Sequence, residues 1–283
     1  MDPKTILVTG ATDGIGKQTA LELAAMGHKV LLHGRDRRRT QAALDETLRE
    51  RATGNRSLVG YTADFSELAQ VRRLADEVKA RHERLDVLVN NAGVFMGECV
   101  LTKDGLETTF QVNHLAPVLL TRLLLDRLKA GAPARIVNIS SATHASAELN
   151  FDNIQGERRY DAYGAYELSK LGNLYFTYQL APELAGSGVT VTALHPGGIS
   201  TKLLRAGWGG GGRSVEQGAQ TPVYLAASPE VEGLTGGYYE NKRPTRSSAA
   251  SYDEALRERF MALSQQLIDQ VSPEPTRGSA GGG

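Results

Sequence analysis

Short apolar runs alternate along the chain with longer stretches in which apolar residues recur at helical spacing. The short runs are rich in β-branched residues and almost continuously apolar, which is typical of strands that are covered on both faces. They lie at 5–9, 30–34, 58–63, 87–90, 135–140 and 189–194. The helical stretches lie near 15–26, 37–51, 67–82, 104–129, 162–185 and 214–228. This alternation predicts an α/β protein with a doubly wound parallel sheet between layers of helices.

Two irregular stretches follow predicted strands, at the end of the sheet where ligands bind in such folds. Residues 142–161 are polar and mixed, and residues 196–213 include four consecutive glycines. Because fixing glycines costs much conformational entropy, we interpret 196–213 as a mobile substrate lid, with a plain surface loop as the alternative. We expect a single domain over 1–272 and a disordered tail at 273–283, which is rich in Pro, Gly and Ser.

The composition argues against several classes of protein. Lys+Arg and Asp+Glu balance at 32 each, so nothing indicates a nucleic-acid partner. We expect neither a signal peptide nor an integral membrane segment, since no run approaches the ~18 apolar residues of a membrane span. The single cysteine, Cys99, cannot form an internal disulfide and suits a cytoplasmic location. The six histidines show no ligand spacing, so we expect no metal site.

The first predicted strand leads into the glycine pattern Gly10-Ala11-Thr12-Asp13-Gly14-Ile15-Gly16, which then opens a helix. Gly10 permits a tight turn, Gly14 allows a pyrophosphate to approach the backbone, and Gly16 allows the helix to pack closely on the strand. The free N–H groups and the positive dipole end of the helix would bind phosphate. In this position the pattern predicts a dinucleotide-binding turn rather than a simple tight turn.

The end of the second predicted strand bears on which dinucleotide binds. An NAD site usually places an acidic residue there for the ribose 2′-hydroxyl, whereas this chain has His33-Gly34-Arg35. A planar guanidinium suits a 2′-phosphate, so Arg35 favours NADP(H) over NAD(H). The arginines at 37–39 have an alternative interpretation as a solvated helix start, for which Asp36 is the expected N-cap.

Tyr166 and Lys170 are four residues apart in a predicted helix and therefore lie on one face. An ammonium beside a phenol stabilises the phenolate, so the pair could exchange a proton near neutral pH. None of the neighbouring tyrosines has a lysine four residues further on: Tyr160, Tyr163, Tyr175 and Tyr178. The spacing is common in helices, and its meaning depends on the surrounding motifs.

Together these motifs resemble the short-chain dehydrogenase/reductase family over about residues 4–270, in matching order. The resemblance extends to Asn90-Asn91-Ala92-Gly93, to the serine strand 136–141 and to Pro196-Gly197. The 25-residue separation of Ser141 from Tyr166, the run 140–144 and the segment 224–239 resemble the retinol-dehydrogenase-like branch, which includes relatives of the WW-domain-containing oxidoreductase. The resemblance implies a Rossmann-type, three-layer α/β/α fold of about seven strands.

The resemblance also implies roles for individual residues. The catalytic set would be Asn113, Ser141, Tyr166 and Lys170. Besides Tyr166 and Lys170, the cofactor-binding residues would be Gly10, Thr12, Asp13, Gly14, Ile15, Gly16, Arg35, Asp64, Phe65, Asn91, Ala92, Gly93, Pro196, Gly197, Ile199 and Thr201. Ser140 is the alternative to Ser141, because adjacent strand residues face opposite ways.

The implied reaction is a reversible hydride transfer between NADP(H) and a small apolar alcohol, aldehyde or ketone. Tyr166 would be the acid/base, its pKa lowered from about 10 by Lys170 and the oxidised nicotinamide. Ser141 would hydrogen-bond the substrate oxygen, and Asn113 would link Lys170 to solvent through ordered water. His144 either touches substrate or is a polar loop residue, and Trp208 either covers the substrate or is simply exposed.

Two other classes of function stay open at this point. The same fold can host a non-redox lyase, isomerase or cyclase, or a nucleotide-sensing interaction protein. The complete Asn–Ser–Tyr–Lys set favours the oxidoreductase. The resemblance further implies a homo-oligomer, either a dimer or a tetramer. The substrate itself is not readable, because 142–161, 196–213 and 240–252 would shape its site.

Overall fold

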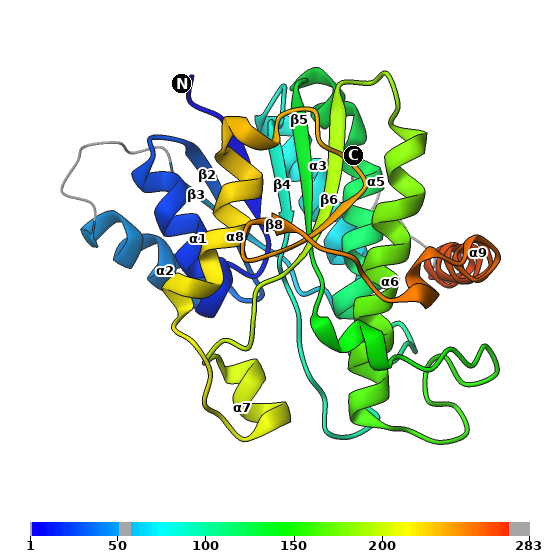
Figure 1. The fold of residues 1–283 in the computed structure, drawn as a ribbon. Helices are drawn as coiled ribbons and strands as arrows, with labels where there is room; N and C mark the ends of the chain where they lie inside the picture. Colours follow the sequence, from blue (N-terminus) through cyan, green and yellow to red (C-terminus); the bar gives the residue numbers. More distant parts are fainter. Residues whose placement is uncertain (1, 51–57, 272–283) are drawn as a thin grey trace, which may run out of the picture.

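The computed structural model describes residues 2–50 and 58–271, and one eight-stranded sheet forms its centre (Figure 1). The strand order is β3-β2-β1-β4-β5-β6-β7-β8. The first seven strands are parallel, and the two-residue β8 pairs antiparallel with β7. The bounds are Thr5–Val8 (β1), Lys29–Gly34 (β2), Leu58–Thr62 (β3), Val87–Asn90 (β4), Ala134–Ile139 (β5), Val189–His195 (β6), Gly237–Glu240 (β7) and Arg243–Pro244 (β8).

Helices cover both faces of this sheet, so the doubly wound α/β fold is confirmed (Figure 1). One face carries α1 (Gly14–Ala25), α2 (Arg37–Glu50) and α8 (Val215–Ala227), which share a hydrophobic cluster with β1 and β2. The other face carries α3 (Leu68–Arg81), α5 (Ala116–Ala130) and α6 (Ala162–Glu183). The last helix, α9 (Glu254–Gln270), packs on α6. None of the described helices is both long and apolar enough to cross a membrane.

The strands are buried because helices remove water from both of their faces. Every residue of β4 and β5 is buried, and the β1 side chains from Ile6 to Val8 have no exposed surface. Alternate residues of a strand therefore belong to two separate hydrophobic clusters, one on each face of the sheet. Leu7 and Leu88 pack towards α3 and α5, whereas Ile6 and Val87 pack towards α1 and α8. This burial explains why the strands read as continuous apolar runs in the sequence.

The six strands and most helices predicted from the sequence are confirmed to within a few residues. The helix predicted over 104–129 is wrong in its first part. There Glu107 caps a single turn, α4 (Thr108–Phe110), which runs into a π-helical segment, η1 (Gln111–Leu115), before α5 begins. The cause lies in Pro117, which has no N–H and cannot make the α-helical bond to the carbonyl of Asn113.

The sequence suggested that the stretch 196–213 is irregular throughout, but part of it is helical in the structure. It contains the short helix α7 (Lys202–Trp208), which Thr201 caps at the start and which Gly209 ends in a left-handed conformation (φ 77°). The strands β7 and β8 and the helix α9 of the C-terminal region were also absent from the predicted strand and helix pattern. The predicted tail at 273–283 lies outside the described residues.

Strand order reverses between β1 and β4, which are neighbours at the centre of the sheet. In open α/β sheets the crevice beyond the carboxyl ends of such strands binds ligands. The glycine turn follows β1 and Asn91 follows β4, so both lie at this point. The ends of β5 and β6 lie beside them and place Ser141 and Pro196 at the same edge.

Candidate active site

The glycine turn after β1 is packed against the residues that follow β4. Gly10 has a positive φ of 63°, and a Cβ there would lie 2.7 Å from Cα of Ala92. A Cβ on Gly16 would collide with the side chain of Asn91. Two of the three motif glycines are therefore needed because chain segments approach closely, as the sequence pattern predicted.

Thr9 and Asn91 lock the turn in place. The Thr9 hydroxyl accepts hydrogen bonds from the N–H groups of Asn91 (2.9 Å) and Ala92 (3.0 Å), while Nδ2 of Asn91 donates to the Thr9 carbonyl (2.8 Å). Asn91 was expected to bind the cofactor. Its side-chain nitrogen donates to the backbone of the turn and so helps to fix the shape of that turn, and the cofactor contact stays a prediction.

The first turn of α1 presents backbone donors at the same edge. Oδ1 of Asp13 accepts from the N–H of Gly14 (2.8 Å) and so caps the helix, while Oδ2 pairs with Lys202 of α7 at 2.5 Å. The N–H groups of Ile15 and Gly16 have no partner among the described residues. These are the donors that a helix N-terminus offers to a phosphate.

His33 is a supporting residue whose role the sequence did not show. Nδ1 accepts from the N–H of Gly10 (3.2 Å), Nε2 donates to the carbonyl of Ala63 (2.9 Å), and the ring stacks on Phe65 with centroids 4.4 Å apart. Burial lowers the pKa of His33 to about 4, so the ring is neutral near pH 7. It ties the ends of β2 and β3 to the glycine turn.

The residues expected around the adenosine lie at the ends of β2 and β3. Gly34 packs against Thr12, so that the exposed Arg35 follows directly beside the glycine turn. Arg35 has no ion-pair partner within the described chain. Asp36 accepts from the N–H of Arg39 (2.9 Å), which confirms it as the cap of α2. Oδ1 of Asp64 accepts from the N–H and hydroxyl of Ser66, whereas Phe65 is buried under His33.

Tyr166, Lys170 and Ser141 meet beyond the end of β5. The Tyr166 hydroxyl hydrogen-bonds with the Ser141 side chain, and Nζ of Lys170 lies 5.3 Å from the centroid of the Tyr166 ring. Lys170 is almost fully buried and donates to the carbonyl of Ile139 (3.2 Å). That carbonyl also accepts from Nδ2 of Asn173 (3.1 Å). The helix α6 and the end of β5 thus present a phenol, a hydroxyl and an ammonium at one place.

The two candidate serines face opposite ways. Ser140 is turned towards α6, where its hydroxyl donates to the carbonyl of Lys170 (2.8 Å). Ser141 accepts from the N–H of Thr143 (3.3 Å) and approaches the phenol. The geometry therefore puts Ser141 rather than Ser140 beside Tyr166.

Asn113 is held by the chain after β4. Its Oδ1 accepts from the N–H of Val94 (2.7 Å), and its Nδ2 donates to the Val94 carbonyl (2.9 Å) and to the hydroxyl of Ser169 (3.1 Å). A Cβ on Gly93 would lie 3.4 Å from Oδ1 of Asn113 and 3.7 Å from Nζ of Lys170. Asn113 and Lys170 therefore flank Gly93 from neighbouring positions.

Burial shifts the titration of both members of the pair away from the charged forms. It raises the pKa of Tyr166 well above its usual value, which the hydrogen bond with Ser141 opposes. Burial also lowers the pKa of Lys170 to about 8. The expected lowering of the Tyr166 pKa by Lys170 is therefore wrong for the protein groups alone, because burial of the phenol dominates its titration.

Aromatic side chains surround the phenol on the side of α7. Trp208 lies with its ring centroid 5.4 Å from that of Tyr166, and Phe95 lies at 6.0 Å. Tyr163 contacts both Phe95 and Trp208, and its hydroxyl donates to the carbonyl of Gly207. We call Phe95, Tyr163 and Trp208 the aromatic cluster. The segment that was interpreted as a lid therefore touches the candidate acid/base directly.

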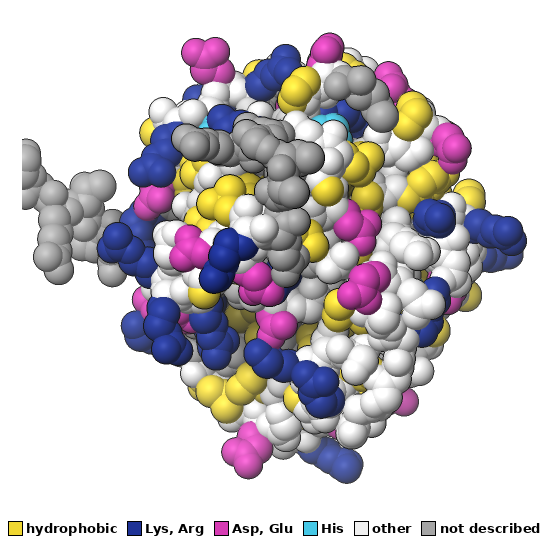
Figure 2. Space-filling view, turned by 90° about the vertical axis from the view of Figure 1, so that its left-hand side faces the viewer, with side chains coloured by type: hydrophobic (Ala, Val, Ile, Leu, Met, Phe, Trp, Pro, Cys, Tyr) yellow, Lys and Arg dark blue, Asp and Glu magenta, His cyan; other side chains and the backbone are white. Residues whose placement is uncertain are grey.

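The remaining predicted residues line the start of that segment. Thr201 lies against Gly14, with its Cγ2 3.2 Å from where a Cβ of that glycine would be. Ile199 is buried and bridges to Arg213, which closes the base of the segment. A cavity opens here between α1 and α7, lined among others by Lys17, Lys202 and Arg205. Figure 2 views this side of the molecule and shows many Lys and Arg side chains over its lower part.

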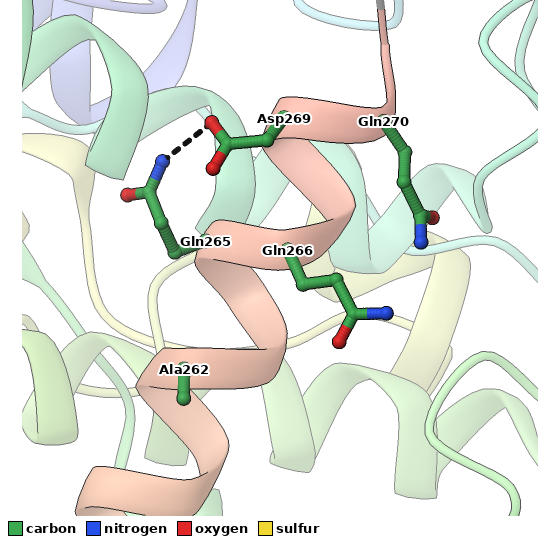
Figure 3. Close-up of a pocket in the computed structure, with 5 residues that line it drawn as sticks. All are labelled: Ala262, Gln265, Gln266, Asp269 and Gln270. Atoms are coloured by element: carbon green, nitrogen blue, oxygen red, sulfur yellow. Dashed lines mark hydrogen bonds between the residues drawn. The ribbon is translucent and has the colours of Figure 1, made fainter.

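Other hollows and reactive groups lie apart from this arrangement. A hollow on α9 is lined by residues of that helix alone, none of which belongs to the predicted site: Ala262, Gln265, Gln266, Asp269 and Gln270 (Figure 3). Among the described residues no cluster of His, Cys, Asp and Glu could hold a metal ion. Cys99 is exposed, and slight burial together with Glu107 and Glu157 raises its pKa, which opposes thiolate formation.

Comparison with known proteins decides the family. The model of the short chain dehydrogenase family matches residues 4–208, which is more than half of the chain. The chain belongs to the short-chain dehydrogenase family.

Two human members, retinol dehydrogenase 14 and retinol dehydrogenase 13, are 38% and 39% identical to this short-chain dehydrogenase. Each alignment covers 95% of the chain, and they cover 87% and 86% of the two relatives. A putative uncharacterized protein from Mycobacterium paratuberculosis has a similar structure, with a TM-score of 0.78, 32% identity and coverage of 94% and 93%. The resemblance to the retinol-dehydrogenase-like branch is thereby confirmed.

Members of the family bind NAD or NADP. One similar structure, a putative NAD(P)-dependent gluconate 5-dehydrogenase from Beutenbergia cavernae with bound NADP, has a TM-score of 0.69 and 29% identity, covering 84% of this chain and 94% of that one. The residues of this short-chain dehydrogenase fit such a cofactor. The N–H groups of Ile15 and Gly16 are unpaired within the described chain, and at the end of β6 the buried Nδ1 of His195 likewise lacks a partner there.

Proposed function

We propose that the protein is an NADP(H)-dependent alcohol dehydrogenase or carbonyl reductase that acts on a small apolar alcohol, aldehyde or ketone. One observation carries this proposal: the Tyr166 hydroxyl meets the Ser141 side chain beside the buried ammonium of Lys170. The three groups stand at the sheet edge next to the phosphate-binding turn. A proton donor, an oxyanion-stabilising hydroxyl and a cofactor cradle are the parts that carbonyl reduction needs.

The chemistry divides between cofactor and protein. When bound, the nicotinamide would supply the hydride to the carbonyl carbon or accept it from the alcohol. Tyr166 gives a proton to the substrate oxygen at its hydroxyl during reduction and takes one during oxidation. Ser141 holds that oxygen through a hydrogen bond. Lys170 is anchored on the Ile139 carbonyl. It stabilises the phenolate and would hold the ribose of a bound nicotinamide.

Two groups of residues support the choice of NADP(H) as cofactor and of an apolar substrate. The exposed and unpaired Arg35 beside Thr12 favours NADP(H), because a guanidinium suits the 2′-phosphate. The aromatic cluster next to Tyr166 favours an apolar substrate, because three rings offer large apolar contact area. Asn113 keeps Val94 and Gly93 in place beside Lys170, which is the position from which a water-mediated proton path to solvent can start.

The test uses the purified chain with NADPH and a panel of apolar aldehydes and ketones, followed by the ultraviolet absorbance of NADPH. We expect oxidation of NADPH with several panel members, and the reverse reaction with the matching alcohols and NADP. Absence of turnover across the panel, with NADPH binding demonstrated by its fluorescence, would contradict the proposal. That result would favour a non-redox lyase, isomerase or cyclase, or a nucleotide-sensing protein. A cytoplasmic location and a homo-oligomer stay predictions.

A further inference from the structure

His144 is a buried histidine that the proposed reaction does not use. It lies in the 3₁₀ turn η2 (Ala142–Ser146), three residues after Ser141, and is only 4% exposed. Nδ1 lies 2.6 Å from the carbonyl oxygen of Ser141, and Nε2 lies 3.0 Å from the backbone nitrogen of Ser248. The ring also packs edge-on against Tyr238 of β7, with centroids 5.3 Å apart. One side chain therefore joins three segments that are distant in the sequence.

These two hydrogen bonds fix the tautomer of the ring. A backbone N–H can only donate, so Nε2 accepts from Ser248 and carries no proton. A carbonyl can only accept, so the proton lies on Nδ1 and is donated to Ser141. The neutral ring is used as a donor on one side and an acceptor on the other, so a doubly protonated ring could not keep both contacts.

The contact with Ser141 restrains its backbone. The Ser141 carbonyl accepts from the ring of His144 and also from the backbone N–H of His144 (3.2 Å). Two donors on one carbonyl hold the rotation about the Cα–C bond of Ser141, which is extended (φ −155°, ψ 153°). Thr143 restrains the hydroxyl itself, through its N–H (3.3 Å) and its own hydroxyl (3.1 Å). Backbone and side chain of Ser141 are thus held by separate partners.

The contact with Ser248 connects Ser141 to a second support. Ser248 belongs to the segment 245–252, which lies on α6: the Tyr175 hydroxyl donates to the carbonyl of Ala250 (3.1 Å), and the Tyr178 hydroxyl lies 2.6 Å from that of Ser247. Tyr175 and Tyr178 come from the same helix as Tyr166. A path of hydrogen bonds therefore runs from the helix of the proposed acid/base through 245–252 and His144 to Ser141.

We propose that His144 is a positioning residue, which holds Ser141 in register with Tyr166 by coupling the Ser141 carbonyl to the segment 245–252. This inference rests on the proposed function, in which the Ser141 hydroxyl binds the substrate oxygen. Of the two hydrogen bonds of the ring, the one that His144 donates to Ser141 should have the larger effect on turnover. Small displacements of an oxyanion-stabilising group lower the rate strongly.

Three variants separate the two contacts of the ring. In His144→Asn the side-chain NH₂ takes the place of Nδ1 and keeps the donor to Ser141. In His144→Gln the longer side chain places an acceptor near Nε2 and keeps only the contact with Ser248. His144→Phe keeps the ring and neither hydrogen bond. A matched control is His28→Gln, a buried histidine whose Nδ1 accepts from the N–H of Lys4 at the opposite edge of the sheet.

We expect kcat to fall roughly 10- to 100-fold in the Gln and Phe variants with little change in KM, because the lost contact acts in the transition state. The Asn variant should recover most of the activity, and the control should match the wild type. Equal losses in all three His144 variants, or full activity in all three, would overturn the proposal. An active His144→Gln variant together with an inactive His144→Asn variant would also overturn the proposal, since turnover would then depend on the contact with Ser248 and not on that with Ser141.

A second measurement does not depend on turnover. The ¹⁵N resonances of the His144 ring report its tautomer, and the amide and Cα resonances of Ser141 report its backbone. We expect a proton on Nδ1 in the wild type, and shifts of the Ser141 resonances in the Gln and Phe variants but not in Asn. A proton on Nε2, or unshifted Ser141 resonances, contradicts the positioning role. Failure of the wild type to reduce any carbonyl contradicts the proposed function instead.

Discussion

Trp208 lies edge-on to Tyr166, with ring centroids 5.4 Å apart and an angle of 70° between the ring planes. The contact joins α7 to the proposed acid/base itself. At the other end of α7, Lys202 pairs with Asp13 at the start of α1. The short helix therefore spans from the glycine turn to the phenol, the two places where the proposed function puts the cofactor phosphates and the substrate oxygen.

Replacement of Trp208 tests whether the aromatic cluster binds the substrate. We expect Trp208→Ala to raise KM for apolar carbonyls roughly two- to tenfold, the range that corresponds to ~0.5–1.5 kcal/mol of aromatic contact. The thermal midpoint should change little, because Trp208 is 38% exposed. Steady-state kinetics with short and long aliphatic aldehydes provide the measurement. Leu234→Ala, at a similarly exposed site before β7, is the control, and equal KM values in both variants would count against the cluster.

Removal of the Tyr166 hydroxyl should abolish most of the turnover. We expect Tyr166→Phe to lower kcat by roughly 10²- to 10⁴-fold, the contribution of a positioned proton donor. NADPH binding, measured by fluorescence, should persist. Tyr61→Phe is the matched control, because it removes a buried phenol of β3 that hydrogen-bonds with His82 and plays no part in the proposed site. A Tyr166→Phe variant with wild-type kcat would show that another group supplies the proton.

Lys170 should lower the stability of the folded protein while it serves the reaction. Burial lowers its pKa in the folded state to about 8, from an ordinary value of 10.5. Below pH 8 the ammonium is buried at a cost, so Lys170→Met should be inactive yet unfold at equal or higher urea concentration. Between pH 8 and 10.5 only the unfolded chain keeps the proton, so the free energy of unfolding of the wild type rises with pH. The difference in stability between Lys170→Met and the wild type should therefore narrow over this interval. A difference that widens over this interval would contradict the burial argument.

His33 should make the folded state sensitive to acid. Its folded-state pKa is about 4, below the ordinary value of 6.5, because the ring is buried. The unfolded chain therefore binds a proton first as the pH falls from 6.5 to 4, and the free energy of unfolding should decline over this window. His33→Gln should decline less steeply, which denaturation at several pH values can measure. The pKa of His114 is also about 4, so His114 contributes to the loss of stability over the same pH window. The variant therefore reports only the part of that loss that is due to His33.

Arg35 should select between the two dinucleotides. We expect Arg35→Ala to weaken NADPH relative to NADH by roughly 10- to 100-fold, equivalent to the ~1.5–3 kcal/mol of hydrogen bonds to a charged group. The ratio of kcat/KM for the two cofactors is the measurement. Arg38→Ala, at the exposed second residue of α2, is the control. An unchanged ratio in Arg35→Ala would remove the basis for NADP(H).

Much of the architecture could be predicted because local pattern and tertiary environment agree. Strands such as Val87–Asn90 are buried on both faces and show it as continuous apolar runs. The glycine turn was recognisable because its spacing reflects real close approaches, such as that of Gly10 to Ala92. Alternation along a strand, a short-range rule, indicated that only one of Ser140 and Ser141 could face the site, and the family resemblance put it at Ser141.

The missed features depend on contacts between distant parts of the chain. The π-helical turn at Asn113 follows from Pro117, but a proline in the middle of a helical pattern does not by itself indicate a π-helical turn. His33 and His144 read as ordinary histidines, because their partners Gly10 and Ser248 are 23 and 104 residues away. The pKa of Tyr166 was expected to fall, and the extent of its burial could not be known from the sequence.

The position of α9 has a consequence for synthesis of the chain. Every residue of the proposed catalytic set precedes residue 171, yet Phe260 fills the space against Phe110, His114 and Tyr175 and has no exposed surface. A nascent chain that ends before α9 would carry Tyr166 and Lys170 on a helix whose α9-facing side is still exposed to water. The apolar space beside Phe110, His114 and Tyr175 can therefore be filled only after α9 has left the ribosome.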